Sequence, residues 1–156
     1  MARVYLETSF ISACVTDRTD TANAYRRQVS FDWWQTQRHI YETAISEEVL
    51  KELSSPRSPH REAALSLIAK IPLLGIGQEV RGLAKILVDA LVMPGPADTG
   101  DAVHVAVATV HGCEYMLSWN VQHLANVNKA RQLMVICRRV GYVPPQIVTP
   151  DILRGE

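Results

Sequence analysis

Short, continuous apolar runs alternate along the chain with longer segments in which apolar residues recur every three or four positions. The short runs predict buried strands of a parallel sheet, which read as unbroken apolar stretches. These runs cover residues 3–6, 41–45, 71–76 and 114–118, and one edge strand is expected within 141–153. The longer segments predict amphipathic helices. They cover residues 21–39, 47–53, 61–70, 78–91, 101–111 and 120–139.

Strands that alternate with helices predict an α/β fold, here three α/β/α layers around a central, mainly parallel sheet. Ser46 is a favourable cap for the helix that follows it, and Gly112 is placed to end the helix before it. Thr149 and Pro150 predict one last helical turn. The stretches SSPRSP and MPGPADTG predict loops. Because no repeat, linker or low-complexity segment interrupts the pattern, residues 1–156 are expected to form one domain.

The composition is that of an ordinary globular protein. Hydrophobic residues make up 47% and charged residues 21% of the 156 residues, which excludes a disordered chain and allows a sizeable core. Basic and acidic residues number 16 each, so the formal net charge is zero. A nucleic-acid partner would therefore have to be bound by a local group of cations.

Cysteine usage and the apolar runs indicate the compartment. Cys14, Cys113 and Cys137 form no CxxC pair and are odd in number, which argues against a disulfide framework or a structural zinc site. Glu7 interrupts the first apolar run, so no signal peptide is expected. No segment approaches the ~18 apolar residues of a membrane span. The sequence predicts a cytoplasmic protein without a membrane partner.

Side chains that carry oxygen atoms follow several of the predicted strands. Glu7 follows the first strand, residues 46–52 follow the second, and residues 118–120 follow the fourth. A further group, residues 98–101, opens the most apolar helix. Because ligands of open α/β sheets bind beyond the carboxyl ends of the strands, these groups are expected to converge there. Convergent hard oxygens suit Mg²⁺ or Mn²⁺, which can activate water for phosphodiester hydrolysis.

Most of these acids also have a structural interpretation. Glu47 and Glu48 lie in the first turn of their helix, where carboxylates interact favourably with the helix dipole, and we assign them that role. Glu52 can be a solvated or ion-paired side chain. Asp98 and Asp101 can cap a helix. An acid at the head of so apolar a helix is nevertheless unfavourable unless it is paired, capping or bound to a metal.

Similar alternatives apply to the other polar candidates. Asn120 can be a turn or cap residue before the last helix. His104 and His111 can be hydrogen-bonded helix histidines. Glu7 has the weakest structural alternative, because a sheet offers little net dipole to an acid at a strand end.

Nucleotide-binding loops are missing from the sequence. There is no G-x-x-x-x-G-K and no G-x-G-x-x-G, and GIGQEVRG has the wrong spacing. A metal-dependent phosphohydrolase on a related α/β scaffold is a weaker alternative, because no DxD follows the first strand.

Four stretches in this order resemble the PIN domain: VYLETSFIS, ISEEVLKEL, DAVHVAVATVHG and YMLSWNVQHLAN. The resemblance is closest to VapC-like toxins of type II toxin–antitoxin systems. The Trp pair at residues 33–34 and the tail CRRVGYVPPQIVTPDIL extend it over nearly the whole chain. It implies a metal-dependent endoribonuclease with one or two Mg²⁺ or Mn²⁺ ions and an RNA substrate. It also implies a homodimer and a small protein antitoxin whose C-terminal segment enters the active-site groove.

The resemblance assigns site residues by position. The acidic ligands of the family correspond to Glu7, Glu52, Asp101 and Asn120, and the polar groups around them to Thr8, Ser9 and Ser118. Two positions depart from the family pattern: Glu7 replaces Asp and reaches about 1.5 Å further, and Asn120 supplies oxygen without charge. Asp98 is a further candidate ligand, because it would restore that charge if it pointed inward.

These departures leave a second hypothesis, a PIN-fold binding or regulatory module with weakened catalysis. If the protein binds RNA, Arg131, Arg138 and Arg139 on the last predicted helix are candidate contacts. A solvated helix face is the simpler interpretation of those three arginines.

Overall fold

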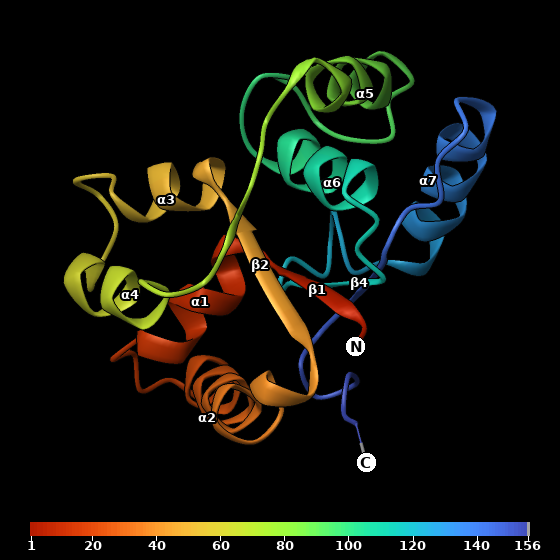
Figure 1. Cartoon of the computed structure of the whole chain (residues 1–156). Helices are drawn as coiled ribbons and strands as arrows, with labels where there is room; N and C mark the ends of the chain where they lie inside the picture. Colours follow the sequence, from red (N-terminus) through yellow and green to blue (C-terminus); the bar gives the residue numbers. More distant parts are fainter. Residues whose placement is uncertain (156) are drawn as a thin grey trace.

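The computed structural model describes residues 1–155 (Figure 1). Residue 156, which belongs to the expected single domain, lies outside the described residues. The strands are β1 Arg3–Leu6, β2 Glu42–Ser46, β3 Leu73–Leu74, β4 Tyr115–Leu117 and β5 Gln146–Val148. The helices are α1 Thr8–Val15, α2 Thr21–Thr36, the 3₁₀ helix η1 Arg38–Ile40, α3 Glu47–Leu53, α4 Arg61–Leu67, α5 Gln78–Asp89, α6 Asp101–Val110 and α7 Val127–Arg139.

The strands form one parallel sheet in the order β3-β2-β1-β4-β5. Val4 of β1 lies beside Thr43 of β2 on one side and Tyr115 of β4 on the other. Along the chain, β2 and β3 are added in turn on one side of β1. The chain then crosses back over the sheet, and β4 and β5 are added in turn on the other side of β1. The predicted α/β class and mainly parallel sheet are confirmed, and the direction of building reverses between β1 and β4.

The same reversal divides the helices between the two faces of the sheet. Helices α1 to α4 connect β1, β2 and β3, whereas α5 to α7 connect β3, β4 and β5. Since β-α-β crossovers are right-handed, building in opposite directions puts the connecting helices on opposite faces. Figure 1 shows α1, α2 and α4 on one side of the strands and α5, α6 and α7 on the other. The expected three layers are confirmed.

One hydrophobic core extends through these layers. Residues 4–6 of β1 are fully buried at its centre. On the α1–α2 face, Trp33 packs edge-on against Phe10, with 5.5 Å between the ring centroids. The indole Nε1 of Trp33 donates a hydrogen bond to Leu153 O at 2.7 Å, so the C-terminal segment is fastened to α2.

Helices α2, α4 and α5 end two or three residues earlier than predicted, and two other helices differ more. The sequence analysis assigned no helix directly after the first strand, but α1 begins at Thr8. Helix α7 begins at Val127, because Asn126 caps it by accepting hydrogen bonds from the N–H groups of Asn128 and Lys129. The residues before that cap form a turn.

The predicted caps were right in part. Gly112 follows the end of α6 with a φ of +70°, as expected for a glycine at that position. Ser46 does precede α3, but its hydroxyl bonds to Tyr5 in the core and does not cap the helix. The predicted last turn is present as an isolated hydrogen-bonded turn, in which Ile152 N donates to Thr149 O, but it does not form a helix.

No helix within residues 1–155 is both long and apolar enough to cross a membrane. Cys14, Cys113 and Cys137 are buried free thiols. Burial raises the pKa of Cys14 and Cys113 to about 12 and that of Cys137 to about 11. All three therefore stay protonated at neutral pH.

Candidate active site

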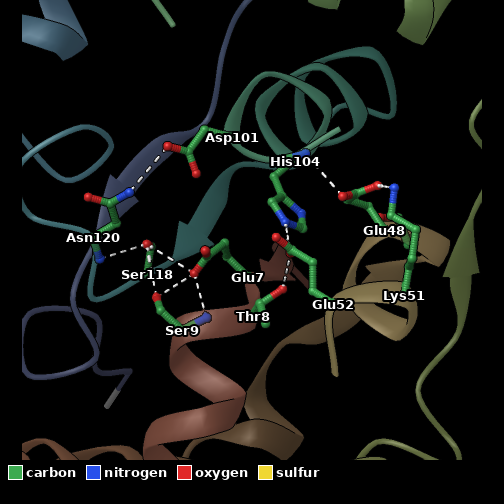
Figure 2. A network of polar contacts seen from close by, with 12 residues as sticks. Glu7, Thr8, Ser9, Glu48, Lys51, Glu52, Asp101, His104, Ser118 and Asn120 are labelled. Atoms are coloured by element: carbon green, nitrogen blue, oxygen red, sulfur yellow. Dashed lines mark hydrogen bonds and ion pairs between the residues drawn. The ribbon is translucent and has the colours of Figure 1, made fainter. Parts of the chain in front are cut away.

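The strand-end residues meet where the sheet reverses its direction of building. The backbone N–H of Glu7, directly after β1, donates to Leu117 O of β4 at 3.1 Å. Ser118 follows β4, and its N–H donates to Val148 O of β5 at 3.1 Å. Open α/β sheets bind their ligands at this place, beyond the carboxyl ends of the two strands that flank the reversal. Figure 2 shows the polar network found there.

Glu7 is only 6% exposed, and it forms no ion pair with any of residues 1–155. As the N-cap of α1, its Oε2 accepts a hydrogen bond from the N–H of Ser9 at 2.8 Å. The same oxygen accepts from the hydroxyls of Ser9 and Ser118. Burial raises the pKa of Glu7, against the opposing charge of His104 and the donors of Ser9. The helix that sequence analysis missed thus gives Glu7 a structural role as well.

A buried chain of hydrogen bonds holds Glu52. Its Oε1 contacts His104 Nε2 at 2.5 Å and accepts a hydrogen bond from Thr8 Oγ1 at 2.5 Å. His104 Nδ1 contacts the Tyr5 hydroxyl at 2.6 Å, and that hydroxyl contacts Ser46 Oγ at 2.7 Å. His104 is fully buried. The chain joins β2, β1, α6, α3 and α1, so the position of Glu52 depends on both layers of helices.

The pKa shifts within this chain favour a histidinium–carboxylate pair. Burial acts to lower the pKa of His104, but the hydrogen bond to Glu52 and the charges of Glu7, Glu52 and Glu48 outweigh it and raise that pKa. Burial acts to raise the pKa of Glu52, but His104 and Thr8 bring it below its usual value. Glu52 therefore forms a direct ion pair with His104, whereas Glu7 forms no ion pair within residues 1–155.

Removing the Tyr5 hydroxyl tests the buried chain. Tyr5→Phe is expected to lower the free energy of unfolding by about 1–3 kcal/mol, because Ser46 and His104 each lose a buried hydrogen-bond partner. Urea titration measures the change. Tyr142→Phe is the matched control, since its exposed hydroxyl donates to Glu79 at 3.4 Å and its loss should leave the midpoint unchanged. Equal midpoints for the Tyr5 variant and the wild type would contradict the role given to this chain.

Asp101 begins α6 and lies beside Asn120 (Figure 2). Asn120 Nδ2 donates to Asp101 Oδ2 at 3.3 Å, while Asn120 Oδ1 accepts from the N–H of His123 at 3.1 Å. Only the amide oxygen can accept from that N–H, so the amide nitrogen must face Asp101. Burial raises the pKa of Asp101. Asn120 is thus both a turn residue and a hydrogen-bond donor to the site.

Two serines tie the ends of β1 and β4 together. Ser9 Oγ accepts a hydrogen bond from the N–H of Trp119 at 2.9 Å, and Ser118 Oγ accepts one from the N–H of Asn120 at 3.0 Å. Both hydroxyls also donate to Glu7, Ser118 at 3.2 Å. The serines therefore fix one carboxylate oxygen of Glu7 in place.

Glu48 and Asp98 lie outside this arrangement. Glu48 is buried, accepts a hydrogen bond from Gly100 N at 3.0 Å and forms an ion pair with Lys51 at 2.9 Å. It lies in the first turn of α3, as expected, and it also anchors the start of α6 to α3. Asp98 is exposed and lines a separate groove with Glu48 and Lys51. Among residues 1–155, no hydrogen bond joins Asp98 to the network around Glu7.

The donor set has the chemistry for a hard cation, although its arrangement is sparse. In the described part of the chain, no three His, Cys, Asp or Glu side chains are grouped so that they could hold a metal ion. Mg²⁺ often uses only one or two protein carboxylates and keeps several waters. Glu7 and Asp101 suit such a site: Glu7 Oε1 and Asp101 Oδ1 accept no hydrogen bond from residues 1–155.

Sequence reasoning missed Tyr5 as a member of the site, and it placed Ser46 at the strand end without finding its bond to Tyr5. The available signal was the hydroxyl of Tyr5 within an otherwise apolar buried strand, because a buried tyrosine usually finds a hydrogen-bond partner. His104 was assigned as a hydrogen-bonded histidine, as observed. The sequence matches no model of a known family and no curated protein.

Proposed function

We propose that the protein is a metal-dependent endoribonuclease of the PIN type, which hydrolyses RNA phosphodiester bonds with Mg²⁺ or Mn²⁺. The carrying observation is the pair of carboxylates on Glu7 and Asp101, beyond the reversal of the sheet. Burial raises the pKa of both, and neither forms an ion pair within residues 1–155. Two desolvated carboxylates without a cationic partner favour a bound divalent cation.

The residues of the site would have different roles in holding the ion. Glu7 and Asp101 would hold the ion through the oxygens that accept no hydrogen bond from the protein. Ser9 and Ser118 fix the other oxygen of Glu7, which sets the direction of its carboxylate. Glu52 adds a negative charge whose position is set by His104. When bound, the ion would supply an activated water and offset the charge that develops on the phosphate.

A PIN-fold binding or regulatory module is the second candidate. Asn120 favours it, because its oxygen bonds to the N–H of His123 and leaves only two uncompensated carboxylates for a metal. A weakly held ion would reduce turnover without preventing RNA binding.

Cleavage of a mixed RNA pool by purified protein tests the proposal. With Mg²⁺ or Mn²⁺ the wild type should cut, and with EDTA it should not. Asp101→Asn should abolish cutting, because it removes a ligand charge while keeping an acceptor for Asn120. The matched control is Asp89→Asn, which removes an exposed carboxylate paired with Lys85 on α5. Metal-independent cutting, or full activity of Asp101→Asn, would refute the proposal, and RNA binding without cutting would favour the binding module.

The proposal extends to a protein antitoxin and a homodimer, which rest on the resemblance to VapC-like toxins, and to a cytoplasmic location, which rests on the cysteine usage and the apolar pattern of the sequence. The expected antitoxin is the product of a small open reading frame beside the gene. Its co-expression should suppress RNA cleavage by the purified complex.

A further inference from the structure

A groove of about 480 Å³ opens directly beside the candidate active site. Its size lies within the ~300–1,000 Å³ typical of ligand sites. Ser9 and Asn120, which donate hydrogen bonds to Glu7 and Asp101, are among its lining residues. A molecule in this groove would therefore lie next to the two carboxylates.

The groove is basic. Arg18, Arg26 and His60 line it, and no carboxylate is among its lining residues within 1–155. His60 is paired with Asp17 at 2.9 Å, but neither arginine forms an ion pair with any described residue. The nearby Asp20 caps α2 and is bound by the side chain of Asn23. In a protein with no net charge, Arg18 and Arg26 thus supply positive charge to the lining of a groove beside an acidic site.

Arg26 is held in place before any ligand arrives. Its guanidinium lies over the ring of Trp119, 5.3 Å from the centroid. Trp119 is itself fixed, because its Nε1 donates to Ser30 Oγ at 2.7 Å and its backbone N–H donates to Ser9 Oγ at 2.9 Å. The ring of Tyr25 packs edge-on against the same indole at 6.2 Å. A guanidinium ordered in advance loses less entropy when it binds an anion.

We propose that this groove binds the sugar–phosphate backbone of single-stranded RNA next to the bond that is cut, with Arg18 and Arg26 contacting the phosphates. The inference rests on the proposed function, because the carboxylates beside the groove, which Ser9 and Asn120 contact, are its reaction site. A polyanion approaching Glu7, Glu52 and Asp101 is repelled unless cations lie along its path. Basic grooves that follow the backbone are how proteins hold single strands, and phosphate contacts position the chain without reading its sequence.

We therefore expect RNA to contact this groove, and not the arginines of the last helix that the sequence suggested. Arg131, Arg138 and Arg139 belong to α7, which lies on the opposite face of the sheet from α1 and α2 (Figure 1). The arginines of the groove lie beside the site itself, because Arg26 contacts Trp119 and Trp119 contacts Ser9.

Equilibrium binding of a fluorescein-labelled single-stranded RNA of about eight nucleotides, in EDTA so that nothing is cut, tests the groove. Arg18→Ala and Arg26→Gln should each weaken binding roughly 10-fold and reduce the slope of log K against log salt by about 0.7. Arg139→Ala on α7, the matched control, should bind like the wild type. Arg18 is exposed and its side chain forms no hydrogen bond or ion pair with residues 1–155, and Gln keeps part of the side chain over Trp119.

Each result decides between the two proposals. The groove assignment would be overturned if both groove variants bound RNA as tightly as the wild type, or if Arg139→Ala lost as much affinity as they did. It would also be overturned if the wild type did not bind RNA. Each of these outcomes would count even if metal-dependent cleavage were found. If only the groove variants lost affinity for RNA and the wild type showed no metal-dependent cleavage, the groove would be supported as an RNA-binding site and the proposed nuclease activity would be refuted.

Discussion

The Glu7→Gln variant is expected to lose roughly 100-fold or more of metal-dependent RNA cleavage, at the upper end of what loss of a residue supporting a metal costs. In metal-free buffer the same variant is expected to be more stable than the wild type by about 1–2 kcal/mol. Gln fills nearly the same volume and still accepts the hydrogen bond from Ser9 N, but it carries no buried charge. Opposite effects on activity and stability distinguish a site acid from an acid that merely caps a helix.

The stability gain should depend on pH. Burial raises the pKa of Glu7 in the folded protein, so above the usual carboxyl pKa the folded state binds protons here more readily than the unfolded chain. The contribution of Glu7 to the free energy of unfolding therefore falls as pH rises from the usual to the raised pKa. Gln does not titrate, so the advantage of the variant should grow across that window and then level off.

Thermal melting and RNA cleavage measure the two effects. Glu47→Gln is the matched control, because Glu47 is exposed in the first turn of α3 and makes no ion pair with residues 1–155. Saturating Mg²⁺ should raise the melting temperature of the wild type and of Glu47→Gln, but not of Glu7→Gln. Lower stability of Glu7→Gln together with full cleavage activity would show that Glu7 is only a helix cap.

Trp33→Ala is expected to cause the largest loss of stability, about 3–5 kcal/mol. Trp33 is fully buried, stacks on Tyr41 with 5.7 Å between centroids, and packs edge-on against Phe10. Its removal leaves a cavity between α1 and α2 and an unpaired carbonyl on Leu153. Since domains are stable by only about 5–15 kcal/mol, this change should remove a large share of the total.

Urea titration and limited proteolysis measure this effect. Trp33→Phe keeps most of the ring but loses the bond to Leu153 O, so it should lose less stability while still exposing the C-terminal segment to protease. A loss below about 1 kcal/mol for Trp33→Ala would contradict the position of Trp33 in the core.

The elements that sequence predicted best are those whose pattern is uniform. The runs RVYL and DAVHVAVATV predicted β1 and α6 to within one residue, because nearly every residue in each of them is buried. Helix α1, TSFISACV, was missed because its apolar residues follow β1 with only a short polar break. Its start depends on the carboxylate of Glu7 as a cap, which residue type alone did not suggest.

The site was predictable in outline only. The rule that strand ends converge brought Glu7, Glu52, Asp101 and Asn120 to one edge of the sheet (Figure 2). The partners of these side chains depend on how distant helices pack, as in the bond between His104 and Glu52, 52 positions apart. The spacing of apolar residues along the sequence does not show which distant side chains contact one another.

Two further details of the site depend on short-range geometry. The orientation of Asn120 is set by the turn that brings the N–H of His123 to its oxygen. Asp98 is exposed in the loop before α6 and lines a separate groove. Sequence could name the residues but not the direction in which each one points.

The pairing of β1 with β4 has a consequence for protein synthesis. Glu7 is made early, but the hydroxyl of Ser118 that holds its carboxylate lies 111 positions further along the chain. At about 5–20 residues per second, a ribosome needs roughly 5–20 s to add that stretch. Throughout this interval the nascent chain can pair β1 only with β2, and Glu7 lacks the partners that β4 brings. Any capacity to cut RNA must therefore appear late in translation, after residue 118 has emerged and joined the sheet.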